Sequence, residues 1–176
     1  MKDIVILYES CCLYEIVSTN YYLQFSGAEV VFAGLGKHPV RTKEGFSVNV
    51  DCCLEEIDFS DVRSLILPGG NKAFLGTDEV KAAIRSVYSA GKLVAAICAA
   101  PSILGRMGLL DGRKYACYPG FESLVSGGIH TGKKVEQDDI FITAEGMGVA
   151  DEFGFYLIGL LFGTEKEAEI RQSVRK

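Results

Sequence analysis

The sequence Leu93-Val94-Ala95-Ala96-Ile97-Cys98-Ala99-Ala100-Pro101 decides how this chain of 176 residues folds and where its chemistry lies. Its first five residues are an apolar run too short for a surface helix, which predicts a buried strand of a parallel sheet. Pro101 suits the first turn of a helix, where its missing N–H group is no loss. Cys98 then lies among unpaired backbone N–H groups at a helix start, which predicts a lowered thiol pKa. We interpret this turn as a nucleophile elbow that lacks the usual glycines.

The overall composition is that of one globular domain. Hydrophobic residues make up 48% of the chain and charged residues 23%, so we expect residues 1–176 to form a single domain with a sizeable core. No apolar run is long enough to span a bilayer and the N-terminus lacks the apolar region of a secretion signal, which predicts a cytoplasmic protein with no membrane partner. A net charge of −5 argues against a nucleic-acid partner, because phosphate binding needs clustered lysine and arginine.

The six cysteines do not indicate a disulfide framework in a chain of this length and class. Two vicinal pairs could together form a zinc site, but no Cys-x-x-Cys or Cys/His spacing supports one. We therefore expect no metal and no cofactor. The roles of five cysteines stay open, with small core or surface residues as the plain interpretation: Cys11, Cys12, Cys52, Cys53 and Cys117.

Strand-like and helix-like segments alternate along the chain. The patterns predict strands at residues 3–8, 28–33, 64–67, 93–97 and 114–117, hairpins at 40–50 and 135–143, and helices at 12–25, 78–90, 101–104, 147–161 and 165–174. Such alternation predicts right-handed crossovers and an α/β, flavodoxin-like three-layer sandwich with a mostly parallel central sheet and an inserted β-hairpin. Ligands of these sheets bind beyond the carboxyl ends of the strands, which is where Cys98 emerges.

Backbone amides near Cys98 form the next candidate feature. Gly69 and Gly70 directly follow a predicted strand, and their N–H groups could form an oxyanion hole together with the amide of Ala99. A simple tight turn is the plain alternative. The spacing matches neither a phosphate-binding loop nor a dinucleotide-binding loop.

Candidate acids and bases are less well determined by the sequence. Four glutamates stand near predicted strand ends or helix starts, and the sequence does not choose among them: Glu9, Glu15, Glu122 and Glu145. A buried glutamate beside a thiol would have a raised pKa and could shuttle a proton. His130 is the histidine downstream of Cys98, and either approaches that thiol or is an ordinary loop residue.

Three motifs taken together resemble the DJ-1/ThiJ/PfpI superfamily and its DJ-1-like branch. They are Leu65-Ile66-Leu67-Pro68-Gly69-Gly70, the segment Ala95-Ala96-Ile97-Cys98-Ala99-Ala100-Pro101, and Glu15 on the first helix. The resemblance implies a homodimer in which Cys98 is a reactive, easily oxidised thiol, Glu15 is its carboxylic partner, and Gly69, Gly70 and Ala99 supply backbone amides. Members are described as cofactor-independent glyoxalases, deglycases, chaperones and oxidative-stress sensors, and some relatives are labelled thiazole monophosphate biosynthesis proteins.

One position departs from the family pattern. The family histidine that approaches the cysteine aligns with Tyr118, and tyrosine is a poor base at neutral pH. Glu15 is then the better proton shuttle, which favours a cofactor-independent enzyme acting on 2-oxoaldehydes, of the glyoxalase or deglycase type. The alternative is an oxidative-stress sensor or protective chaperone that works through oxidation of Cys98. A cysteine peptidase or amidase would require His130 to reach Cys98.

Overall fold

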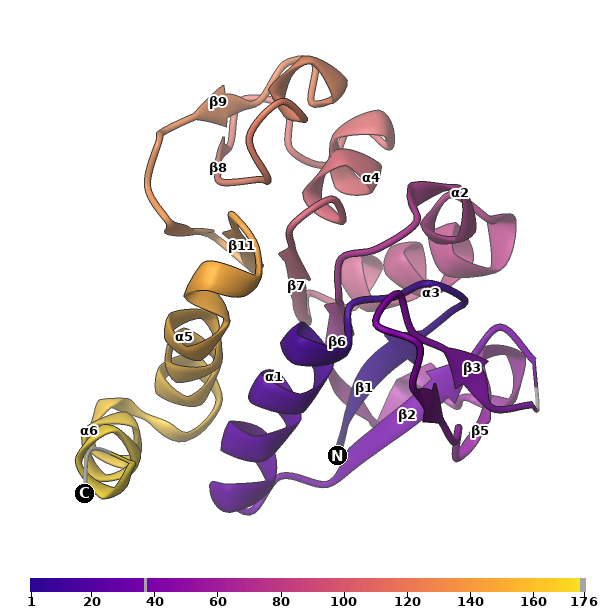
Figure 1. Cartoon of the computed structure of the whole chain (residues 1–176). Helices are drawn as coiled ribbons and strands as arrows, with labels where there is room; N and C mark the ends of the chain where they lie inside the picture. Colours follow the sequence, from indigo (N-terminus) through magenta and orange to yellow (C-terminus); the bar gives the residue numbers. More distant parts are fainter. Residues whose placement is uncertain (37, 175–176) are drawn as a thin grey trace.

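A seven-stranded sheet forms the centre of the computed structural model, which describes residues 1–36 and 38–174 (Figure 1). Its strands run in the order β10-β11-β7-β6-β1-β2-β5, and all neighbours are parallel except β10 and β11. The strands are β1 (Lys2–Leu7), β2 (Val30–Gly34), β5 (Cys52–Cys53), β6 (Val62–Leu67), β7 (Leu93–Ile97), β10 (Val135–Asp138) and β11 (Phe141–Ala144). This arrangement confirms the predicted flavodoxin-like fold with its mostly parallel central sheet.

The three central strands are apolar because both faces of the sheet are covered. Residues 4–7 of β1, 65–67 of β6 and 94–97 of β7 are all buried, so their sequences show continuous apolar runs in place of alternation. Asp3 is the buried exception. Its carboxylate pairs with the Arg63 guanidinium and accepts a 2.7 Å hydrogen bond from the Ser64 hydroxyl, so the charge is compensated within the protein.

Helices cover the sheet on both sides. On one side, α1 (Leu13–Phe25) packs against α5 (Ala150–Phe162), and α6 (Thr164–Ser173) packs against α5, while α3 (Asp78–Ser89) lies behind β6 and β7 (Figure 1). Thr77 caps α3 by accepting a hydrogen bond from the Val80 N–H group. In the ranges that the structure describes, none of the helices has both the length and the apolar character needed to cross a membrane.

Several short elements differ from the sequence-based expectations. The predicted hairpin is present as β3 (Val40–Arg41) and β4 (Ser47–Val48), which form a small sheet of their own. Sequence patterns do not reveal the edge strand β5, the one-turn helix α2 (Lys72–Leu75), or the parallel pairing of β8 (Lys114–Tyr115) with β9 (Ile129–His130). These elements have two to four residues, which is too few for a hydrophobic period to be visible. The helix predicted from residue 147 begins instead with a 3-10 turn at Met147–Val149.

Candidate active site

The turn after β7 holds Cys98 in an uncommon backbone conformation. Its φ angle is +65°, in the left-handed region, and this conformation costs a non-glycine residue roughly 1–3 kcal/mol. Two backbone hydrogen bonds of 2.9 Å hold it there: the Cys98 N–H donates to the Ala144 carbonyl, and the Cys98 carbonyl accepts from the Tyr118 N–H. Helix α4 (Pro101–Arg106) follows at once. The chain thus has the sharp strand-to-helix turn of a nucleophile elbow at the predicted position.

Glu15, in the first turn of α1, is the glutamate that meets Cys98. Its side chain is 1% exposed, and its Oε2 atom accepts a 2.6 Å hydrogen bond from the Gly69 N–H group. A Cβ atom added at Gly69 would lie 2.8 Å from both the Cys98 Sγ and the Glu15 Oε2. The thiol and the carboxyl therefore face each other across a position that only glycine can occupy. Among the four glutamates that the sequence leaves open, the structure brings Glu15 to the thiol.

The proton affinities of the pair differ in part from expectation. Burial raises the pKa of Glu15, as predicted, and the Gly69 amide and Lys43 offset only part of that effect. Burial also raises the pKa of the Cys98 thiol to about 12, and the negative charge of Glu15 adds to this increase. The predicted lowering of the Cys98 pKa is therefore wrong for the resting protein, because desolvation and the neighbouring acid outweigh the Ala99 amide and the start of a six-residue helix.

A cavity of about 380 Å³ opens beside the pair. Its walls come from helix α1, the β3–β4 turn, the 147–149 turn, and the loops that follow β1, β6, β7 and β8. The lining residues are Ser10, Glu15, Lys43, Gly70, Asn71, Cys98, Ala99, Tyr118, Phe121 and Met147. The Ala99 amide hydrogen-bonds the Cys98 sulfur. The amide of Gly69, in contrast, is engaged by Glu15, so Gly69 positions the acid and does not face the cavity as an oxyanion donor.

Two of the lining residues carry chemistry that the sequence does not reveal. Lys43 comes from the β3–β4 turn and is the basic side chain of the cavity; burial alone would lower its pKa, but Cys12 and Glu15 outweigh that effect and raise it. Ser10 has a φ angle of +63° and donates its N–H to the Arg41 carbonyl at 2.7 Å, which fixes the hairpin against the site. No local pattern marks either residue, since only the fold brings the hairpin to this place.

Of the two other residues predicted to lie near the Cys98 thiol, Tyr118 lines the cavity and His130 does not. Tyr118 lines the cavity, next to Phe121. His130 lies instead with Cys117 and Glu122, in a group of three potential metal ligands outside the cavity. Among the described residues, His130 therefore does not form the Cys–His pair with Cys98 that a peptidase or amidase would need.

Comparison with known proteins identifies the family. A sequence model described as the DJ-1/PfpI family matches residues 1–160. The chain belongs to the DJ-1/PfpI family. This assignment agrees with the glycine turn, the elbow cysteine and the helix glutamate that meet in the structure.

Relatives within the DJ-1/PfpI family support this assignment along most of the chain. A deglycase of Pyrococcus abyssi is 34% identical over 119 residues, which are 65% of this chain and 71% of the relative. A glutathione-independent glyoxalase of Caenorhabditis elegans is 27% identical over 155 residues, covering 86% of this chain and 83% of the relative. The solved structure of oxidized Toxoplasma gondii DJ-1 superimposes with a TM-score of 0.92 at 28% identity, covering 98% of this chain and 97% of that one.

Proposed function

We propose that this member of the DJ-1/PfpI family converts 2-oxoaldehydes such as methylglyoxal, free or as adducts, without a cofactor, and that Cys98 is its nucleophile. The observation that carries the proposal is the pairing of the Cys98 thiol with the buried Glu15 carboxyl across Gly69. The adjoining cavity of about 380 Å³ is large enough for a three-carbon substrate. The names of the related deglycase and glutathione-independent glyoxalase support the same substrate class.

The reaction begins with proton transfer, because the resting thiol holds its proton. Glu15 accepts that proton as the Cys98 sulfur bonds to the aldehyde carbon, and returns it to the carbonyl oxygen to give a hemithioacetal. The raised pKa of Glu15 makes its carboxylate a stronger base than an ordinary one. Glu15 then removes the hydrogen of that carbon as a proton and delivers it to the neighbouring carbon. The hydroxyl proton of the hemithioacetal passes to the oxygen of the neighbouring carbon, which leaves a thioester beside a new hydroxyl group. Water hydrolyses the thioester, releases a 2-hydroxy acid and restores the thiol.

Three groups around the cavity assist these steps. The amides of Gly70 and Ala99 line the space next to the sulfur, where the substrate oxygen gains negative charge, and such donors stabilise an oxyanion. Lys43 adds a positive charge at the same place. Tyr118, in the position of the family histidine, contributes a wall of the cavity and a hydroxyl group that can donate a hydrogen bond.

Turnover of methylglyoxal in the absence of glutathione tests this proposal. We expect Cys98→Ser and Glu15→Gln each to abolish formation of lactate, while Cys52→Ser, on the edge strand β5, serves as the matched thiol control and retains it. Circular dichroism should confirm that all three variants are folded. Unchanged turnover in folded Cys98→Ser would refute the proposal.

A sensor of oxidants is the second candidate, and one observation favours it. The Oε1 atom of Glu15 is buried and has no hydrogen-bond partner among the described residues. A protonated Oε1 could donate to a sulfinate formed on Cys98, and would thereby stabilise the oxidised thiol. Mass spectrometry after mild peroxide treatment tests this function, because a sensor would accumulate oxygen on Cys98 ahead of the other cysteines. Oxidation spread evenly over the six cysteines would exclude it.

We also propose that the protein is a homodimer joined through α1. Four apolar side chains at helical spacing remain about half exposed on this helix: Tyr14 at 52%, Val17 at 55%, Tyr21 at 51% and Phe25 at 52%. A second copy of the chain would cover this stripe. Sedimentation of the Tyr21→Asp/Phe25→Asp double variant should give half the mass of the unsubstituted protein, and an unchanged mass would refute the α1 interface.

Two broader features complete the proposal. We propose that residues 1–176 form one domain, which is supported by the seven-stranded central sheet, whose strands come from residues 2–144. A cytoplasmic location is supported by the six cysteines, all of which are free, since thiols persist in reducing compartments.

A further inference from the structure

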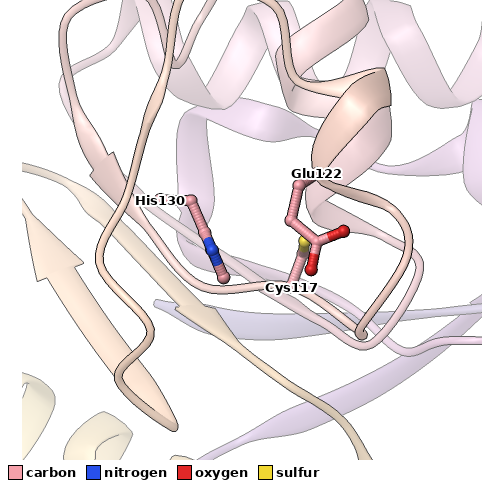
Figure 2. A group of neighbouring side chains, drawn as sticks. All are labelled: Cys117, Glu122 and His130. Carbon is pink, nitrogen blue, oxygen red and sulfur yellow. The ribbon is translucent and has the colours of Figure 1, made fainter.

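The segment between β8 and β9 brings three side chains of metal-binding type together. The Cys117 sulfur, a Glu122 carboxylate oxygen and a ring nitrogen of His130 all lie within 4.8 Å of one another. Figure 2 shows the imidazole of His130 turned toward the carboxyl of Glu122 and the sulfur of Cys117. Of these three residues, none lines the Cys98 cavity. Cys117, Glu122 and His130 thus form a group that is separate from the Cys98 cavity.

Hydrogen bonds and a ring contact hold the three residues or their direct neighbours in place. Cys117 precedes Tyr118, whose N–H donates to the Cys98 carbonyl at 2.9 Å. Glu122 opens a 3-10 turn (Glu122–Leu124), and its Oε2 accepts a 2.7 Å hydrogen bond from the Gly120 N–H group. His130 lies on β9, with its ring centroid 5.4 Å from that of Tyr115. The three side chains thus converge because of the local fold, and the Gly120 amide holds the Glu122 carboxylate in place by a hydrogen bond, as polar neighbours of metal-binding side chains do.

The donor set is that of a zinc site. Thiolate, imidazole and carboxylate are the three protein ligands of Zn²⁺, and at bond lengths of roughly 2.0–2.3 Å their donor atoms lie about 3.5 Å apart. The present separations, all within 4.8 Å, need a contraction of about 1 Å, which side-chain rotation can supply. Three protein ligands leave the fourth tetrahedral position for water or an external group.

Charge and access favour a cation over the alternatives. A Glu122 carboxylate oxygen lies within 4.8 Å of the Cys117 sulfur, so a cation bound between the two would offset the negative charge of both ligands. The Cys117 side chain is 1% exposed whereas His130 is exposed, so an ion can enter past the imidazole although a substrate cannot reach the sulfur. A catalytic triad would also need a Cys–His and a His–Glu hydrogen bond, and within residues 1–36 and 38–174 neither is found between these three side chains.

We propose that Cys117, Glu122 and His130 form a binding site for Zn²⁺ or a similar thiophilic divalent cation. Cys117 and Glu122 directly flank residues 118–121, and within that segment Tyr118 and Phe121 form one wall of the Cys98 cavity. A bound ion holds this wall in place from behind. The site does not depend on the reaction proposed at Cys98.

Metal titration of the full chain tests the proposal in a Cys98→Ser background, which removes the thiol that faces Glu15. After removal of metal with a chelator, Co²⁺ should bind one ion per chain and give a thiolate-to-cobalt absorption band. Competition with Zn²⁺ should yield a dissociation constant of about 1 μM or lower. Addition of Cys117→Ser should remove the band, and addition of Glu122→Gln or His130→Gln should weaken binding about tenfold or more.

Matched controls separate this site from nonspecific binding. Cys52→Ser and His38→Gln, in the same background, replace another cysteine and the other histidine and should leave the affinity unchanged. Because His130 is exposed, His130→Gln should fold even if Cys117→Ser does not. Absence of the cobalt band, or an affinity that His130→Gln leaves unchanged, would overturn the proposal.

Discussion

The contacts of Cys98 with Glu15 and of Cys117 with Glu122 are two cysteine–glutamate contacts that suit different chemistry. At the first, Cys98 has a φ angle of +65°, faces a cavity, and shares its surroundings with backbone amides. At the second, Cys117 is 1% exposed and is joined by a histidine. A cysteine and a glutamate thus suit carbonyl chemistry where the backbone presents the sulfur to a cavity, as at Cys98. They suit metal binding where a histidine lies beside them and the sulfur does not line that cavity, as at Cys117.

Replacement of each of the two cysteines by serine, in separate variants, should give the largest difference in activity between the two sites. Cys98→Ser should lower kcat/KM for methylglyoxal by about 10³-fold or more, since the hydroxyl is a far weaker nucleophile. Cys117→Ser should lose far less, because that sulfur does not reach the cavity. Steady-state assays of both variants give the answer, and equal losses would remove the distinction between the two places.

A smaller loss is expected from Gly69→Ala. The added methyl group would lie 2.8 Å from the Cys98 Sγ and 2.8 Å from the Glu15 Oε2, so it must separate the pair. Displacement of about 1 Å costs on the order of 10²-fold in rate. Gly148→Ala is the matched control, because its methyl group would meet nothing within 4 Å. Equal activity of the two alanine variants would show that the Cys98–Glu15 contact is dispensable.

Removal of the charge on Glu15 should lower the pKa of the Cys98 thiol and leave Cys117 unaffected. Because the negative charge of Glu15 raises the pKa of Cys98, Glu15→Gln should shift the alkylation of Cys98 by iodoacetamide to lower pH. Cys117, which is 1% exposed, should stay unalkylated in both proteins. Peptide mapping at a series of pH values distinguishes the two sulfurs. If Cys98 titrates at the same or higher pH in the variant, the electrostatic coupling is wrong.

The smallest expected effect concerns stability. The pKa of Glu15 is raised in the folded protein above its usual value of 4.5, so the unfolded chain releases this proton first as the pH rises. The contribution of Glu15 to the free energy of unfolding therefore decreases from about pH 4.5 upward, until the folded pKa is passed. Glu15→Gln lacks this decrease and should be more stable than the unsubstituted protein at pH 7 by about 1 kcal/mol. Urea denaturation at pH 4 and pH 7 checks this. A difference in the free energy of unfolding between the two proteins that becomes smaller toward pH 7 would contradict the prediction.

The fold was largely predictable because its signals are local. Buried strands such as β1 and β7 carry continuous apolar runs, and the threonine cap of α3 stands directly before its helix. The two-residue strands β5 and β9 were not predicted, because no period develops over two residues. The strand predicted at residues 114–117 is present as the shorter β8, but its parallel pairing with β9 was not visible in the sequence.

The candidate site was predictable in its residue types and less so in its electrostatics. A glutamate near the start of α1 and a glycine pair after β6 are visible in the sequence. The residues alone leave four glutamates open, and only the family resemblance singles out Glu15. The raised pKa of Cys98 was missed because burial is a property of the whole fold, whereas the helix start is visible locally. Lys43 and the grouping of His130 with Cys117 were missed because long-range packing sets both.

The left-handed backbone at Cys98 also bears on how this chain can change over generations. Glycine adopts such a conformation without strain, and asparagine does so more readily than most residues. Replacement of Cys98 by glycine would relieve the strain and also lose the sulfur. Cys98→Gly should therefore stabilise the protein wherever relief of the backbone strain outweighs the lost packing of the side chain, so the backbone conformation by itself does not favour a cysteine at this position.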